Sequence, residues 1–146
     1  MANIKIAAVS LNQIPLDFDA NRERIISAIS RAKKEEISVL CFNELTISGY
    51  GCEDMFFSEG LYEKSLESLE LVKEHTENIA CAVGCPVRVD GKNYNSVFLI
   101  ANKKIIGGYA KHVLADDGVY YEQRWFEPWF LGKQTSIKLS LSLIHI

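Results

Sequence analysis

The sequence predicts one α/β domain, in which a mixed β-sheet carries its helices on one face. Two observations lead to this fold class. A strand, a helix and a second strand follow one another within residues 4–42, which is the pattern of a βαβ unit. After residue 79 the pattern changes to short strands separated by turn residues, which is typical of antiparallel hairpins. The length of 146 residues, 48% of them hydrophobic, suffices for one domain with a sizeable core.

The βαβ unit begins with residues 4–11 (IKIAAVSL) and ends with residues 37–42 (ISVLCF). Both runs are almost continuously apolar, which is typical of strands that are covered on both faces. Between them apolar residues recur at helical spacing over residues 18–32, and Asp17 or Asp19 is available as the N-cap. We therefore expect a helix here and two parallel neighbouring strands.

The second half of the pattern is a loop, a helix and a meander. Residues 45–58 are expected to form a loop, and Ser58 is a candidate N-cap for a helix over residues 59–73. Strands are expected at 79–89, 94–101 and 105–109, the first of them interrupted at Cys85–Pro86, with turns at Asp90–Gly91 and Asn102–Lys103.

Composition narrows the class of protein. The formal net charge is -3 and the basic residues are dispersed, which argues against a nucleic-acid partner. Residues 1–15 do not resemble a signal peptide, and no apolar run approaches the roughly 18–20 residues of a membrane helix, so no membrane partner and a cytoplasmic location are expected. The four cysteines are expected to be free thiols, and their spacing does not suggest a metal site.

Three charged residues are candidates for chemistry. Glu44 lies two residues past a strand end, where α/β sheets place ligand sites, and partial burial there would suit it to general-base work. Lys111 follows the last strand and has the charge needed to stabilise a developing oxyanion, and Glu122 is a potential partner for it. The alternatives are a solvated rim glutamate, a lysine that extends into water, and an ordinary surface ion pair.

Two longer motifs resemble the nitrilase (carbon-nitrogen hydrolase) superfamily. They are FNELTISGYGCEDMFF, which holds Glu44, and YNSVFLIANKKIIGGYAKHVLADDGVYYEQRWF, which holds Lys111 and Glu122. The EDMF and EQRWF segments are similar to one branch, the glutamine-hydrolysing domain of glutamine-dependent NAD synthases. The resemblance implies an α-β-β-α sandwich that is incomplete at the C-terminus. It implies a partial domain over residues 1–133, followed by an atypical tail over 134–146.

The resemblance also implies roles for individual residues. Glu44 matches the general base, Lys111 the oxyanion-stabilising lysine, Glu122 an orienting acid, and Tyr50 a tyrosine at the glutamine pocket. The family nucleophile is a cysteine in a later block, whereas all four cysteines here precede Lys111, so we expect no nucleophile in this chain.

The implied reaction is hydrolysis of glutamine through a thioester, which supplies ammonia for NAD biosynthesis. No cofactor is expected in this domain, whereas ATP and Mg²⁺ are implied for a synthetase domain of the same polypeptide that is absent here. The resemblance further implies a homo-oligomer. Two alternatives stay open: another amidohydrolase of the superfamily, such as a carbamoylase or an ω-amidase, and a non-catalytic remnant.

Overall fold

The computed structural model describes residues 3–139 and 142–145. In chain order the elements are β1 (Ile6–Val9), α1 (Phe18–Lys34), β2 (Val39–Phe42), the 3₁₀ helix η1 (Tyr50–Phe57), α2 (Glu59–Lys73), β3 (Ala80–Val89), β4 (Lys92–Ala101), β5 (Lys104–Ala110), the 3₁₀ helix η2 (Glu122–Arg124), β6 (Ser136–Leu139) and β7 (Ser142–His145).

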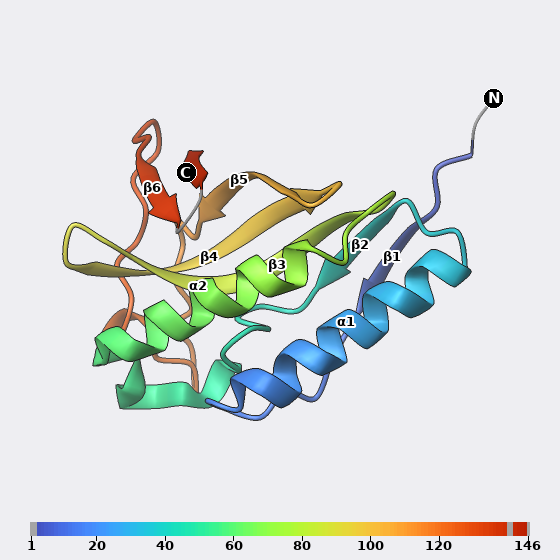
Figure 1. Ribbon diagram of the computed structural model, residues 1–146. Coiled ribbons are helices and arrows are strands. Elements are labelled where there is room, and N and C mark those ends of the chain that lie inside the picture. Colours follow the sequence, from blue (N-terminus) through green and yellow to red (C-terminus); the bar gives the residue numbers. More distant parts are fainter. Residues whose placement is uncertain (1–2, 140–141, 146) are drawn as a thin grey trace.

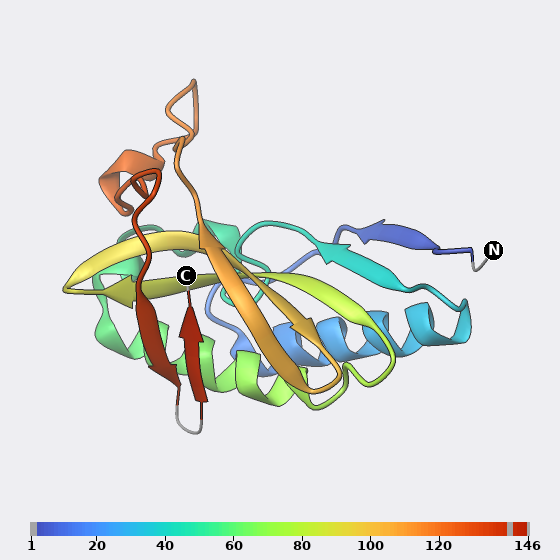
Figure 2. The ribbon, with the colours of Figure 1, turned by 90° about the horizontal axis from the view of Figure 1, so that it is seen from above.

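Strands β1 to β5 form one sheet in the same order as in the sequence. The first three strands are parallel, and β4 and β5 are added as antiparallel hairpins. Both α1 and α2 lie on one face of this sheet (Figures 1 and 2). The predicted βαβ unit, mixed sheet and one-sided helices are therefore confirmed. Strands β6 and β7 form a separate antiparallel pair.

The helix–sheet interface follows the apolar pattern of α1. The Asp17 carboxylate accepts a hydrogen bond from the Ala20 N–H at 3.3 Å, so Asp17 is the N-cap. Ile25 and Ile29 are fully buried in the same cluster as Val83 of β3. Burying a side chain of this size stabilises the fold by about 1.5–3 kcal/mol, so this stripe fixes α1 on the sheet.

Both predicted hairpin turns are confirmed, and the positive φ angles of their backbone explain why these residues occupy them. Asp90 and Gly91 have φ values of 51° and 74°, and Asn102 and Lys103 have 49° and 62°. Two consecutive positive φ values are typical of the type I′ turn, whose twist matches that of the flanking strands. The first turn joins β3 to β4, and the second joins β4 to β5, in which Ala110 at the end of β5 pairs with Ser96 of β4.

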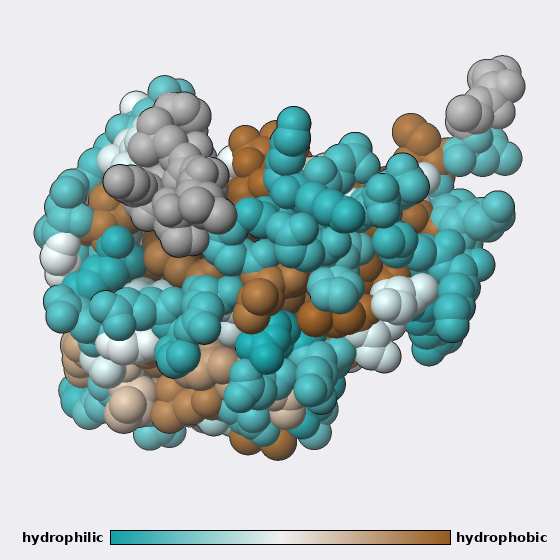
Figure 3. Space-filling model, in the orientation of Figure 1, coloured by the Kyte–Doolittle hydropathy of each residue, from teal (hydrophilic) through white to brown (hydrophobic). Residues whose placement is uncertain are grey.

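The expectation that the first strand is covered on both faces is wrong. The β1 strand lies at the edge of the sheet, and Ile6 is 70% exposed, whereas Ala7 and Val9 pack against the core. At this edge of the sheet the helices cover one face, and the Ile6 side chain on the other face is open to solvent (Figures 1 and 2). Figure 3 shows apolar patches within a mostly hydrophilic surface.

Three local expectations also need correction. The β3 strand runs without a break through Cys85 and Pro86. Proline has no N–H to donate, but the pairing of β3 with β2 ends at Ala82, so Pro86 breaks no hydrogen bond on that side of the strand. Residues 45–58 are not an open loop, since they contain η1. Ser58 stands at the N-cap position of α2 but makes no side-chain capping bond.

Within the described residues, no helix is both long and apolar enough to cross a membrane.

Candidate active site

The site lies at the carboxyl ends of β2 and β5. Glu44 follows β2, and Lys111 follows β5 directly. Because β5 is antiparallel to β4 and β4 is antiparallel to β3, β5 runs in the same direction as β2. Both residues therefore lie at the same end of the sheet, where α/β folds place their ligand sites.

The structure brings the predicted charged residues into direct contact. The Lys111 Nζ lies 2.8 Å from Glu44 Oε1 and 2.8 Å from Glu122 Oε2. The Tyr50 hydroxyl donates to Glu122 Oε1 at 3.0 Å. All four predicted site residues thus belong to one hydrogen-bonded group, although Glu44, at 41% side-chain exposure, is more open than a partly buried rim carboxylate.

Glu122 is the buried anchor of this group. Its side chain is 1% exposed, and it also accepts a hydrogen bond from the Ala115 N–H at 2.7 Å. Burial by itself would raise the pKa of this carboxyl, but the hydrogen bonds from Lys111, Ala115 and Tyr50 outweigh burial and lower the pKa. Glu122 is therefore charged at neutral pH and holds the ammonium in place.

Lys111 and Tyr50 keep their protons as a result. Partial burial would lower the pKa of the Lys111 ammonium, yet its hydrogen bonds to Glu122 and Glu44 dominate and raise the pKa. Burial, the bond to Glu122 and the nearby carboxylates raise the pKa of Tyr50 far above its usual range. The site thus presents a fixed positive charge and a hydroxyl donor over a wide pH range.

Gly84 gives the loop after β2 its place on the sheet. A Cβ at residue 84 would lie 2.5 Å from the Leu45 nitrogen and 2.8 Å from the Asn43 carbonyl oxygen. The Ile47 N–H donates to the Gly84 carbonyl at 3.1 Å across this contact. The absence of a side chain therefore lets the backbone around Glu44 lie directly against β3.

A second contact ties η1 to η2. The Arg124 guanidinium makes two bonds to the Asp54 carboxylate, at 2.7 and 2.8 Å, and the Trp125 indole N–H donates to the same carboxylate at 3.0 Å. These bonds hold the pKa of Asp54 well below its usual range. Because Tyr50 lies in η1 and Glu122 in η2, this contact supports their alignment.

Sequence reasoning missed one member of the group. Asn95 of β4 is buried, and its Nδ2 donates to Glu44 Oε1 at 2.7 Å and to Glu122 Oε1 at 3.1 Å. The asparagine is part of the quoted YNSVF segment, but the strand pattern alone does not show which long-range partners a polar residue faces. Predicting these contacts would have required the register between β3 and β4, in which Asn95 lies opposite Pro86.

The four cysteines are free thiols and lie elsewhere in the fold. Cys81 and Cys85 are buried in β3, and burial raises the pKa of Cys81 to about 12. Cys52 is buried in η1 with its Sγ 3.2 Å from the Ser48 carbonyl oxygen, so the expectation of an open loop around it is wrong. Cys41 is partly buried in β2. Among the described residues, no group of three or more His, Cys, Asp or Glu side chains is arranged to hold a metal ion.

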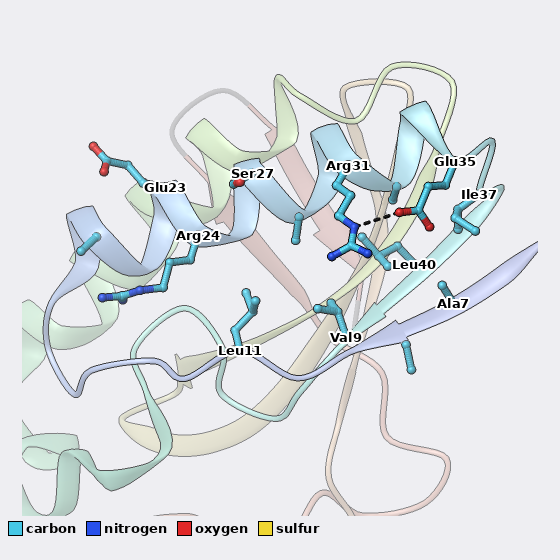
Figure 4. Close-up of a pocket in the computed structure, with 14 residues that line it drawn as sticks. Ala7, Val9, Leu11, Glu23, Arg24, Ser27, Arg31, Glu35, Ile37 and Leu40 are labelled. Atoms are coloured by element: carbon cyan, nitrogen blue, oxygen red, sulfur yellow. Dashed lines mark hydrogen bonds and ion pairs between the residues drawn. The ribbon is translucent and has the colours of Figure 1, made fainter.

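One cavity belongs to the site, and a larger groove lies apart from it. A cavity of about 300 Å³ is lined by Glu44, Asn95, Lys111 and the backbone of Gly84. A larger groove of about 740 Å³ lies between α1 and β1 and is lined by Ala7, Val9 and Leu11 below charged residues of the helix (Figure 4). None of the predicted site residues lines this groove, so its size does not connect it to the chemistry.

Residues 5–144 match the family model of the carbon-nitrogen hydrolases. The chain belongs to the carbon-nitrogen hydrolase family. It is 37% identical to a glutamine-dependent NAD(+) synthetase of Bos taurus over 134 residues, which are 90% of this chain and 19% of that protein. It is also 37% identical to such a synthetase of Arabidopsis thaliana over 131 residues, 88% of this chain and 18% of the relative. The chain thus spans about one fifth of the length of the curated relatives it matches.

Solved structures agree with this assignment. A glutamine-dependent NAD(+) synthetase from Cytophaga hutchinsonii superimposes with a TM-score of 0.94 at 35% identity, over 99% of this chain and 25% of that one. An amidase of the nitrilase superfamily from Nesterenkonia AN1 has a TM-score of 0.75 at 18% identity, over 97% of this chain and 54% of the amidase, which shows the fold alone. The nitrilase-like fold and the resemblance to glutamine-dependent NAD synthases are both confirmed.

Proposed function

We propose that this chain is the glutamine-hydrolysing part of a glutamine-dependent NAD synthetase. The observation that carries the proposal is the Lys111 ammonium, held 2.8 Å from Glu44 and 2.8 Å from the buried Glu122 at one end of the sheet. A base and a fixed cation beside one cavity are what acyl transfer from an amide needs. The identity of the chain to glutamine-dependent NAD synthetases supports glutamine as the amide.

In the first half-reaction, Glu44 takes the proton of a cysteine thiol supplied from outside these 146 residues. The thiolate attacks the side-chain amide carbon of glutamine, so that a C–S bond forms and the carbonyl oxygen becomes an oxyanion. Lys111 stabilises that oxygen with its ammonium. When the C–N bond breaks, Glu44 returns its proton to the leaving nitrogen, and ammonia departs from a γ-glutamyl thioester.

The second half-reaction uses the same base. Glu44 takes a proton from water, whose oxygen attacks the thioester carbon, and Lys111 again stabilises the oxyanion. The C–S bond then breaks, glutamate leaves and the sulfur regains its proton. Glu122 takes no proton in this scheme; its charge holds Lys111, and Tyr50 donates to Glu122 at the edge of the glutamine pocket.

The remaining features belong to the whole protein. We propose that the released ammonia passes to an ATP- and Mg²⁺-dependent synthetase domain of the same polypeptide, and that the full-length protein is a homo-oligomer. No cofactor takes part in the steps assigned to the residues of this chain.

The experiment compares two nitrogen sources for NAD formation by the full-length protein. Glu44→Gln should abolish glutamine-dependent synthesis and leave ammonia-dependent synthesis intact, because Gln cannot accept the thiol proton. Glu127→Gln is the control, since the Glu127 side chain makes an exposed 3.7 Å ion pair with Lys92. Amide hydrolysis without NAD formation would favour another amidohydrolase instead, and no hydrolysis of any amide would favour a non-catalytic remnant.

A further inference from the structure

Asn95 connects the three ionisable residues of the site. Its side-chain Nδ2 donates to Glu44 Oε1 at 2.7 Å and to Glu122 Oε1 at 3.1 Å. Its backbone carbonyl accepts the Lys111 N–H at 2.8 Å. One buried residue of β4 therefore contacts the proposed base, the buried acid and the backbone of the lysine.

The contact with Glu44 distinguishes between the two oxygens of that carboxylate. Oε1 accepts hydrogen bonds from both Asn95 and Lys111. Within residues 3–139 and 142–145, no donor contacts Oε2. Two donors on one oxygen hold the carboxylate in a fixed orientation and leave the other oxygen available to take a proton.

The charge balance of the group requires a neutral donor in this place. Two carboxylates, Glu44 and Glu122, meet a single ammonium, so the group holds one more negative than positive charge. An amide that donates to both carboxylates offsets the repulsion between them and fixes the position of each without adding a charge. An apolar residue would leave the repulsion uncompensated, and an acidic one would add to it.

We propose that Asn95 is a positioning residue of the amide hydrolysis, which holds the Glu44 carboxylate in the orientation that leaves one of its oxygens available to act as the base. The assignment rests on the proposed glutaminase function. It goes beyond a structural role, because it ties a buried amide to the orientation of the base rather than to the stability of the fold.

The strand supplies a matched control two residues earlier. Asn93 is also a buried asparagine of β4, and its Nδ2 also donates twice, to the Phe56 carbonyl at 2.8 Å and the Trp125 carbonyl at 3.2 Å. Those acceptors are neutral backbone groups. Asn93→Leu and Asn95→Leu therefore each remove a side-chain amide donor from β4. Of these two variants, Asn95→Leu is the one that takes hydrogen bonds away from carboxylates.

The experiment measures glutamine hydrolysis by the full-length protein as a function of glutamine concentration. Asn95→Leu should lower kcat at least tenfold with little change in KM, because the carboxylate that takes the proton is no longer held in its reactive orientation. Asn93→Leu should lower thermal stability and leave kcat and KM at their wild-type values. An unchanged kcat in Asn95→Leu would overturn the assignment while the glutaminase function stands.

A second measurement needs no turnover. The rate at which an acylating reagent modifies the Lys111 amine, followed by peptide mass spectrometry, should rise several-fold in Asn95→Leu, because Glu44 is no longer held against the ammonium. Asn93→Leu should leave that rate at the wild-type value. If the wild-type protein hydrolyses no glutamine, the proposed function fails, and this rate alone decides whether Asn95 positions Glu44: equal rates in the two variants refute the role.

Discussion

Replacing Glu122 by Gln should destabilise the protein far more than an ordinary surface substitution. The carboxylate accepts four hydrogen bonds, from Lys111, Ala115, Tyr50 and Asn95, while its side chain is 1% exposed. A Gln amide places one NH₂ group against donors that need an acceptor, and removes the charge that balances Lys111. Breaking a buried pair in this way costs about 3–5 kcal/mol.

The loss of stability caused by Glu122→Gln should decrease as the pH falls. The folded-state pKa of Glu122 is lowered, so its charge contributes stability above the unfolded-state pKa of about 4.3. That contribution disappears from the wild type as pH falls through the folded-state pKa. Because Gln does not titrate, the two proteins should become more similar in stability at acid pH.

Urea denaturation at a series of pH values from neutral downward measures this difference. The control is Glu127→Gln, which removes an ion pair to Lys92 whose two side chains are 51% and 55% exposed, and which should change stability by less than about 1 kcal/mol. A Glu122→Gln loss below about 1 kcal/mol at neutral pH, or one that stays constant as the pH falls, would refute the reasoning.

Three further outcomes are expected. Gly84→Ala should destabilise the protein by about 1–3 kcal/mol in the same denaturation assay, because the new methyl group meets backbone atoms, whereas Gly60→Ala, whose Cβ meets only a side-chain oxygen at 3.8 Å, should not. Tyr50→Phe removes one donor from Glu122 and should lower kcat/KM for glutamine about tenfold in the full-length protein, with ammonia-dependent NAD formation unchanged. The 146-residue chain by itself should release no ammonia from glutamine; release that disappears in Cys52→Ala would make that thiol the nucleophile.

The features that were predictable from the sequence depend on local chemistry. Asp17 caps α1 and Asn102 opens a type I′ turn because each residue suits its own backbone position. The approach of Glu44 to Lys111 was also expected, because the two motifs resemble those of a family in which such residues act together.

The features that were not predictable depend on contacts between distant segments. Ile6 belongs to an apolar run, and its exposure follows from the edge position of β1, where Ala7 and Val9 take the side that packs against the core. Asn95 is one polar residue in an alternating strand, and its partners lie 51 and 27 residues away in sequence. The contact between Asp54 and Arg124 spans 70 residues. Neither periodicity nor turn chemistry carries information about such pairs.

The most direct test of the central claim is to trap the covalent intermediate. The full-length protein is mixed with glutamine, quenched in acid within the first turnover and digested, and the peptides are searched by mass spectrometry for a γ-glutamyl thioester. The account predicts an adduct on a cysteine outside these 146 residues, present in the wild type and lost in Lys111→Met and Glu44→Gln. An adduct on Cys41, Cys52, Cys81 or Cys85, or one that forms equally well in both variants, would contradict it.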